Sequence, residues 1–254
     1  MESIKKPEEW YSDADAYWTS VAANENGMLG GLLLVHEPDI RASKNFLNQV
    51  LKTVNSSYHE NEGKLPTIDK TIATDPNSSG CSEKPGQREL VALDCGAGIG
   101  RVTKFLLSEY AIVDMVEQSA KFVQAAETEY LLDLIKKQRV SGCYVCGLQD
   151  FVPTAGRYDI IWCQWVLGHL TTPDLVSFFK NCVRGLTPNG VIVVKENVCV
   201  AGIVVDEVDS SVTRSSQILQ DVFSQAGLKI ILKRMQYGFP PNLFKVWMWA
   251  LVPS

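Results

Sequence analysis

The sequence has no long apolar run. Its 254 residues are 46% hydrophobic, yet no stretch approaches the roughly 20 consecutive apolar residues of a membrane-spanning helix. The opening Met1-Glu2-Ser3-Ile4-Lys5-Lys6 lacks the apolar core of a secretory signal peptide. These absences predict a cytoplasmic protein without membrane contacts. The length predicts one ordinary domain with additions, or two small domains, with a full hydrophobic core.

An excess of positive charge is also absent. The formal net charge is -5 at pH 7, whereas a protein that binds a phosphate backbone needs a basic face. The composition therefore argues against direct nucleic-acid binding. A small or cationic substrate fits this chain better.

Metal-binding patterns are scarce. Cys143 and Cys146 form a C-x-x-C, but no second pair follows at the spacing of a zinc finger, and the segment is typical of a strand. Cys95 and Cys163 lie in apolar runs, where a thiol behaves as a small hydrophobe. We predict no metal site.

Short apolar runs alternate with amphipathic stretches beyond residue 89. Strands are expected at 90–94, 112–117, 142–147, 158–164, 190–196, 228–234 and 244–251, and helices near 101–109, 119–136, 174–185 and 215–226. This alternation predicts an α/β, Rossmann-like domain, with a seven-stranded, mostly parallel sheet and helices on both faces. Gly238, Pro240 and Pro241 separate the last two strands, which permits an antiparallel hairpin at the sheet edge.

Two helices and a polar segment precede this alternation. The aromatic spacing over Pro7 to Val21 and the apolar face of Ser43 to Lys52 predict helices, with a glycine-rich turn at 27–31 between them. Residues 53–89 are mostly polar and are predicted to form a flexible insertion. We therefore divide the chain into an N-terminal helical extension (1–52), an insertion (53–89) and a core (90–254).

A glycine loop led by an acid follows the first core strand. Asp94 ends the apolar run, and Gly96, Gly98 and Gly100 follow at every second position. Glycines permit a tight turn and let a ligand lie directly on the main chain. A nicotinamide-binding G-x-G-x-x-G would need glycine where Arg101 stands. A carboxylate at this strand end suits the cationic amino-acid part of S-adenosylmethionine (AdoMet) and would repel a pyrophosphate.

The ends of the following strands also carry polar groups. Glu117 stands about 20 residues after the loop, where such folds place an acid for ribose hydroxyls. Gln149 and its neighbours could flank an adenine, and the run from Trp162 to His169 brings an amide, indoles and an imidazole to the same edge. The acid run 206–211 has two readings: a solvated or helix-capping loop, with residues 209–211 capping the helix near 215, or an acidic pocket for a cationic substrate.

The chain resembles the class I AdoMet-dependent methyltransferases. More narrowly, it is similar to the protein N-terminal methyltransferases, which modify the α-amino group of X-Pro-Lys or X-Pro-Arg starts after removal of the initiator Met. The matching stretches outside the insertion are 17–18, 27–31, 93–101, 147–150, 164–169, 188–190, 195–197 and 208–212. The glycine loop is generic to methyltransferases, whereas Gln-Trp-Val-x-Gly-His and Asp-Ser-Ser are specific to this family.

The resemblance implies a role for each site residue. AdoMet would be held by Gly96, Gly98, Arg101, Glu117, Gln118, Leu148, Gln149 and Gln164, with Arg101 on its carboxylate. The peptide would be held by Trp18, Leu29, Gly30, Trp165, Asn197, Asp206 and Ser211. His169 and Asp209 would be the catalytic groups, one or both acting as the base. Trp165 would stack on the substrate proline, and Asp206 and Asp209 would pair with the Lys or Arg at substrate position 3. Phe244 stands where the family has a tyrosine.

Two other functions share this fold. One is methylation of a small-molecule amine, against which the extra aromatic helix and the acidic run argue. The other is a non-catalytic module that keeps the cofactor as a structural ligand. The resemblance implies ribosomal or chromatin-associated protein substrates, and hence the cytoplasm and possibly the nucleus as the site of action.

Overall fold

The structure is a computed structural model that describes residues 5–59 and 89–254. Most of the segment predicted as an insertion, residues 60–88, lies outside the described residues. No helix in the described ranges is both long and apolar enough to cross a membrane.

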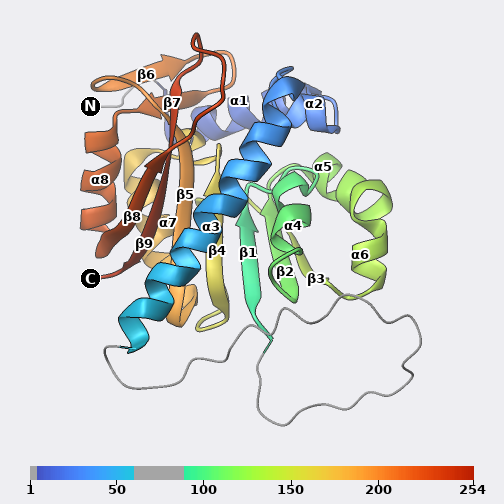
Figure 1. Cartoon of the computed structure of the whole chain (residues 1–254). Helices are drawn as coiled ribbons and strands as arrows, with labels where there is room; N and C mark the ends of the chain where they lie inside the picture. The colour runs from blue at the N-terminus through green and yellow to red at the C-terminus, as the bar shows by residue number, and fades with distance from the viewer. Residues whose placement is uncertain (1–4, 60–88) are drawn as a thin grey trace.

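A seven-stranded mixed sheet forms the centre of the molecule (Figure 1). Its strands are β1 (Val91–Cys95), β2 (Ile112–Glu117), β3 (Val140–Val145), β4 (Tyr158–Gln164), β5 (Leu186–Val198), β8 (Leu228–Met235) and β9 (Lys245–Pro253), in the order β3-β2-β1-β4-β5-β9-β8. Strands β1 to β5 pair in parallel, whereas β9 runs antiparallel to both β5 and β8. The predicted α/β class and the antiparallel hairpin at the sheet edge are confirmed.

Helices cover both faces of the sheet (Figure 1). The helices of the described residues are α1 (Pro7–Ser20), α2 (Glu25–Met28), α3 (His36–His59), α4 (Arg101–Leu106), α5 (Ala120–Ala125), α6 (Leu132–Lys136), α7 (Thr172–Gly185) and α8 (Ser216–Gln225), with short turns η1 (Leu33–Val35), η2 (Ala126–Tyr130) and η3 (Leu167–His169). Phe179 of α7 and Phe223 of α8 belong to one buried apolar cluster, and Phe46 of α3 and Phe105 of α4 belong to the other. The sheet lies between these two layers of helix.

Three local predictions differ from the structure. The helix expected at 119–136 is interrupted by the π-helical turn η2, so α5 and α6 are short. The helix expected at 43–52 begins earlier and ends later, and its last turns occupy 53–59, which we had assigned to the insertion. The acid run 206–211 is the turn of a hairpin between β6 (Ile203–Asp206) and β7 (Ser211–Arg214). Ser215, rather than 209–211, caps α8, because its side chain accepts a hydrogen bond from Ile218 N.

Helices α1 and α2 lie over the end of the sheet where β1, β4 and their parallel neighbours finish (Figure 1). Pro7 at the first helical position and two acids in the first turn favour the start of α1. Trp10 Nε1 donates to the carbonyl of His169 at 2.7 Å, and Lys121 Nζ donates to the carbonyl of Thr19 at 2.9 Å. These contacts fix the extension over the strand ends that such folds use for ligands.

Candidate active site

A cavity with about 900 Å³ of empty space opens at these strand ends. All eight residues predicted to bind the cofactor lie in its wall: Gly96, Gly98, Arg101, Glu117, Gln118, Leu148, Gln149 and Gln164. Trp18, Trp165 and His169 also line it. Residues from the N-terminal extension and from four successive strand ends therefore meet at one site.

The glycine loop lines the cavity with backbone. Gly96 has φ 68° and Gly98 has φ 56°, in the left-handed region that favours glycine. A Cβ on Gly96 would lie 2.3 Å from Val166 Cγ2, and one on Gly98 would lie 2.4 Å from Met28 Sδ. The loop is thus a cradle that only main-chain atoms can form.

We expect Gly96→Ala to weaken AdoMet binding at least ~10-fold, because the added methyl group displaces Val166 and distorts the cavity wall. Gly156→Ala is the matched control: its φ is 62°, and nothing lies within 4 Å of the added Cβ. The control should lose roughly 1 kcal/mol of stability and keep its affinity. Calorimetric titration of both variants checks this, and equal affinity in the two would contradict it.

Glu117 joins the glycine loop to the end of β2. One carboxylate oxygen accepts from Gly98 N at 3.0 Å and the other accepts from Ser119 N at 2.9 Å. Burial raises the pKa of Glu117, and the backbone hydrogen bonds oppose the rise. Its place in the cavity wall suits a carboxylate that accepts from ribose hydroxyls.

Asp94 lies behind the cavity wall rather than in it. It is 2% exposed and accepts a hydrogen bond from Thr103 Oγ1 at 2.7 Å. Burial raises the pKa of Asp94 to about 7, against the effect of the Thr103 bond. Direct pairing with the cationic part of AdoMet, as the sequence suggested, does not follow from this placement.

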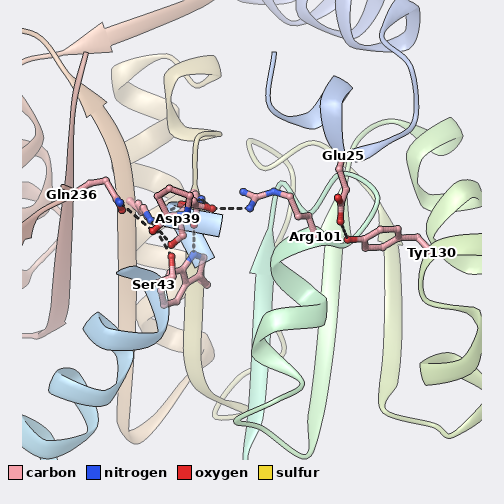
Figure 2. Close-up of polar contacts among 10 residues, drawn as sticks. Glu25, Asp39, Ser43, Arg101, Tyr130 and Gln236 are labelled. Atoms are coloured by element: carbon pink, nitrogen blue, oxygen red, sulfur yellow. Dashed lines mark hydrogen bonds and ion pairs between the residues drawn. The ribbon is translucent and has the colours of Figure 1, made fainter. Parts of the chain in front are cut away.

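Arg101 and Gln164 share a buried partner that the sequence analysis did not single out. Asp39, in the first turn of α3, accepts from Arg101 Nη1 at 2.6 Å and from Gln164 Nε2 at 2.9 Å. The same carboxylate forms an ion pair with the fully buried Lys195. Figure 2 shows Arg101 reaching toward Asp39 across the gap between α4 and α3. In the sequence, Asp39 resembles any acid at a helix start, so no local signal marks it.

A second compartment adjoins the cofactor cavity. Its empty space is about 710 Å³, and Trp18, Met28 and Trp165 line both compartments. The remaining wall includes Leu29, Asn197, Phe239 and Phe244, so it is mostly apolar with one amide. Trp165 has the unusual φ of 53°, and its buried Nε1–H has no hydrogen-bond partner among the residues that the structure describes. An unmet donor between two compartments is typical of a position that a ligand completes.

His169 is held at both ring nitrogens. Trp18 Nε1 donates to His169 Nε2 at 3.1 Å, which leaves Nδ1 to carry the proton and donate to the Ser210 carbonyl at 3.1 Å. Burial lowers the pKa of His169, and the negative charge of Asp209 opposes this shift. The ring is thus a neutral imidazole whose accepting nitrogen is engaged by Trp18.

Asp209 has an unmet acceptor. Its Oδ1 is buried and has no hydrogen-bond partner among the described residues. Asp206, in the same hairpin, is exposed, and its carboxylate accepts from Val208 N at 2.9 Å. Of the other predicted substrate residues, Gly30 is exposed in the turn after α2, and Ser211 is half-buried at the start of β7. Gly30, Asp206, Asp209 and Ser211 line neither of the two compartments.

Glu196 supports the segment that carries Trp165 and His169. Its Oε1 accepts from Val166 N and from Leu167 N, each at 2.8 Å. Burial raises the pKa of Glu196 to about 7, although these two hydrogen bonds oppose the rise. A raised pKa means that the folded state favours the protonated form of this carboxyl.

Glu196 should therefore make the protein less stable as the pH rises. Its contribution is fully present below pH 4.5, the ordinary pKa, and is lost as the pH passes about 7. Glu196→Gln keeps the accepting oxygen without a charge to ionise. Between pH 4.5 and 8 we expect the wild type to lose up to about 3 kcal/mol more unfolding free energy than the variant. Urea unfolding at several pH values measures this, and parallel pH profiles would contradict it.

The site fits AdoMet on three observations. The glycine cradle admits a ligand against the main chain, and Glu117 offers acceptors for ribose hydroxyls. The two cations Arg101 and Lys195 share the single carboxylate of Asp39, so this group of three carries one net positive charge. That charge suits the methionine carboxylate. A parallel sheet with such a site at its strand ends defines a class I AdoMet-dependent methyltransferase.

Comparison with known proteins gives the family. The profile of the AdoMet-dependent proline di-methyltransferases matches residues 6–67 and 79–252, and the chain belongs to this family. AdoMet is thus its cofactor. Over 98% of its length the chain is 41% identical to the zebrafish (Danio rerio) "N-terminal Xaa-Pro-Lys N-methyltransferase 1", covering 97% of that protein. The mouse (Mus musculus) protein of the same name is 38% identical, with 98% of each chain covered.

A solved structure agrees with this assignment. A SAM-dependent methyltransferase of Leishmania major superposes with a TM-score of 0.74 at 32% identity, over 97% of this chain and 85% of that one. The N-terminal helices are included in this coverage, so they are part of the shared fold.

Proposed function

We propose that this enzyme transfers a methyl group from AdoMet to the α-amino group of proteins that begin X-Pro-Lys or X-Pro-Arg. The observation that carries the proposal is the meeting of two compartments at Trp18 and Trp165. One compartment suits the cofactor, and the other is lined by apolar residues with one amide. The names of the zebrafish and mouse relatives support the same substrate class.

The shape and polarity of the second compartment suit a proline-containing N-terminus. Trp165 offers an indole face to a flat apolar ring. Asn197 can donate to or accept from the first peptide unit. The exposed carboxylate of Asp206 and the half-buried one of Asp209 lie in one hairpin turn, where they can pair with a cation at substrate position 3.

Bound AdoMet supplies an electrophilic methyl carbon on its sulfonium. The protein must place a neutral amine in line with that carbon, and positioning provides most of the catalysis. An α-amino group titrates near ~8, so only a weak base is needed. Asp209 Oδ1 has no partner in the described part of the chain and is free to accept a proton from the amine. His169 can act in the same way once the substrate displaces the Trp18 donor from Nε2.

The peptide specificity tests the proposal. The enzyme and AdoMet are incubated separately with peptides beginning Ser-Pro-Lys, Ser-Ala-Lys and acetyl-Ser-Pro-Lys, and the products are weighed. We expect methylation of the first peptide only, because the second lacks the proline ring and the third lacks a free amine. Equal labelling of all three peptides, or reaction with small amines alone, would refute the proposal.

We further propose that the substrates include ribosomal or chromatin-associated proteins, and that the enzyme works in the cytoplasm and also in the nucleus. The proposed motif carries a Lys or Arg at substrate position 3, and the acidic hairpin turn attracts such a cation. Fractionation of cells that express the tagged chain tests the compartment. Recovery in a membrane or secreted fraction would contradict this part of the proposal.

A further inference from the structure

Asp39 is the centre of a buried polar network behind the cofactor cavity. It is 0% exposed and receives hydrogen bonds or ion pairs from the side chains of Arg101, Gln164 and Lys195. These partners come from α4, β4 and β5, whereas Asp39 comes from α3 of the N-terminal extension. Figure 2 shows the carboxylate between Arg101 on one side and the Ser43 and Gln236 side chains on the other. One side chain thus ties the extension to one helix and two strands of the core.

The charge of this network is held in place by its members. Burial raises the pKa of Asp39, but Lys195 and Arg101 outweigh that effect and hold it below its usual value. Burial lowers the pKa of Lys195, and Asp39 opposes the change. Lys195 also donates to Ser43 Oγ at 3.0 Å and to the Asp39 carbonyl at 3.2 Å. Lys195 is therefore fully engaged with α3, and Arg101, which lines the cavity, is the cation available to a ligand.

The ion pair with Asp39 fixes the direction of Arg101. It uses Nη1, one end of a planar guanidinium with five donors, so the direction of the guanidinium is set by a carboxylate that Gln164 and Lys195 also hold. The Arg101 guanidinium also lies 5.6 Å from the centroid of the Trp165 ring. A carboxylate in the cavity then meets a donor that is already oriented, which reduces the entropic cost of binding.

We propose that Asp39 is a positioning residue that presents Arg101 to the α-carboxylate of the cofactor's methionyl group. The inference goes beyond the proposed substrate, because it concerns cofactor binding in the absence of any peptide. It predicts that Asp39 governs affinity only for ligands that carry this carboxylate.

Two ligands separate this role from general support of the fold. S-adenosylhomocysteine carries the amino-acid group, and 5′-methylthioadenosine lacks it. For Asp39→Asn we expect S-adenosylhomocysteine to bind about 10- to 100-fold more weakly by calorimetry, the loss typical of a charged hydrogen bond. Methylthioadenosine affinity should change less than about 2-fold. Equal weakening of both ligands, or unchanged S-adenosylhomocysteine affinity, would overturn the proposal.

The variant could fail to fold, because it leaves Lys195 buried without its partner. Asp39→Asn combined with Lys195→Met removes both charges and still leaves Arg101 without its anchor. This double variant should show the same selective loss of S-adenosylhomocysteine affinity. Ser43→Ala is the control, since Ser43 contacts Lys195 and not Arg101, and it should bind both ligands like the wild type. If the double variant still binds S-adenosylhomocysteine as tightly as the wild type does, the role of Asp39 is also refuted.

Discussion

Asp209→Asn should lower kcat by about 10²- to 10³-fold, within the range for loss of a general base. The affinity for AdoMet should stay unchanged, because Asp209 does not line the cofactor cavity. The physical reason is that its buried Oδ1 has no other partner within residues 5–59 and 89–254, and an amide in the same position is a much weaker base. Steady-state kinetics and calorimetry on the same preparation measure the two quantities. A large loss of AdoMet affinity would show that the residue is misassigned.

Two further variants separate Asp209 from its neighbours. Asp206 lies in the same hairpin turn but is exposed. For Asp206→Asn we therefore expect a higher peptide KM with kcat nearly unchanged. His169→Ala combined with Asp209→Asn should cut turnover further than either change alone if both groups accept the proton. If the double variant is no slower than Asp209→Asn, the imidazole only orients the site through Trp18 and Ser210.

Glu117→Gln should weaken AdoMet binding by about 10²-fold, or roughly 3 kcal/mol. Each carboxylate oxygen accepts a backbone N–H, from Gly98 and from Ser119. Glutamine can replace only one of these acceptors, and its amide group then faces the other donor. The glycine loop loosens and the ribose loses an ionised acceptor. Calorimetric titration with AdoMet gives the affinity.

The matched control is Glu37→Gln, an exposed acid in the first turn of α3. It removes the same charge from the chain without touching the cavity, so the AdoMet affinity should not change. An equal loss in both variants would indicate that net charge, rather than the loop contact, controls binding.

The sequence predicted most of the core because its signals are local. Apolar runs and their spacing placed β1, β2, β4 and α7 within a few residues, and the left-handed glycines followed from the pattern at 96–100. The eight residues predicted to bind the cofactor meet in one cavity because parallel strands bring their carboxyl ends to one edge. The sequence did not predict the hairpin of β6 and β7, because a turn rich in acids is, taken alone, typical of a solvated loop.

Long-range pairing explains what else the sequence did not predict. Asp39 lies 62 residues before Arg101 and 125 before Gln164, so nothing near it indicates that it becomes their buried partner. The Trp18 bond to His169 spans 151 residues and likewise depends on how α1 docks. The burial of Asp94 has a different origin: its partner Thr103 is local, but strand spacing alone does not show that the carboxylate turns away from the ligand edge.

The position of the transferred methyl group distinguishes α-amino methylation from methylation of any other acceptor. The wild-type enzyme is incubated with AdoMet carrying a deuterated methyl group and a peptide beginning Ser-Pro-Lys, and the product is fragmented in a mass spectrometer. If the enzyme methylates the α-amino group, the whole mass increase lies on the first residue's α-nitrogen. Label on the lysine side chain, or no label while AdoMet is bound, would contradict it.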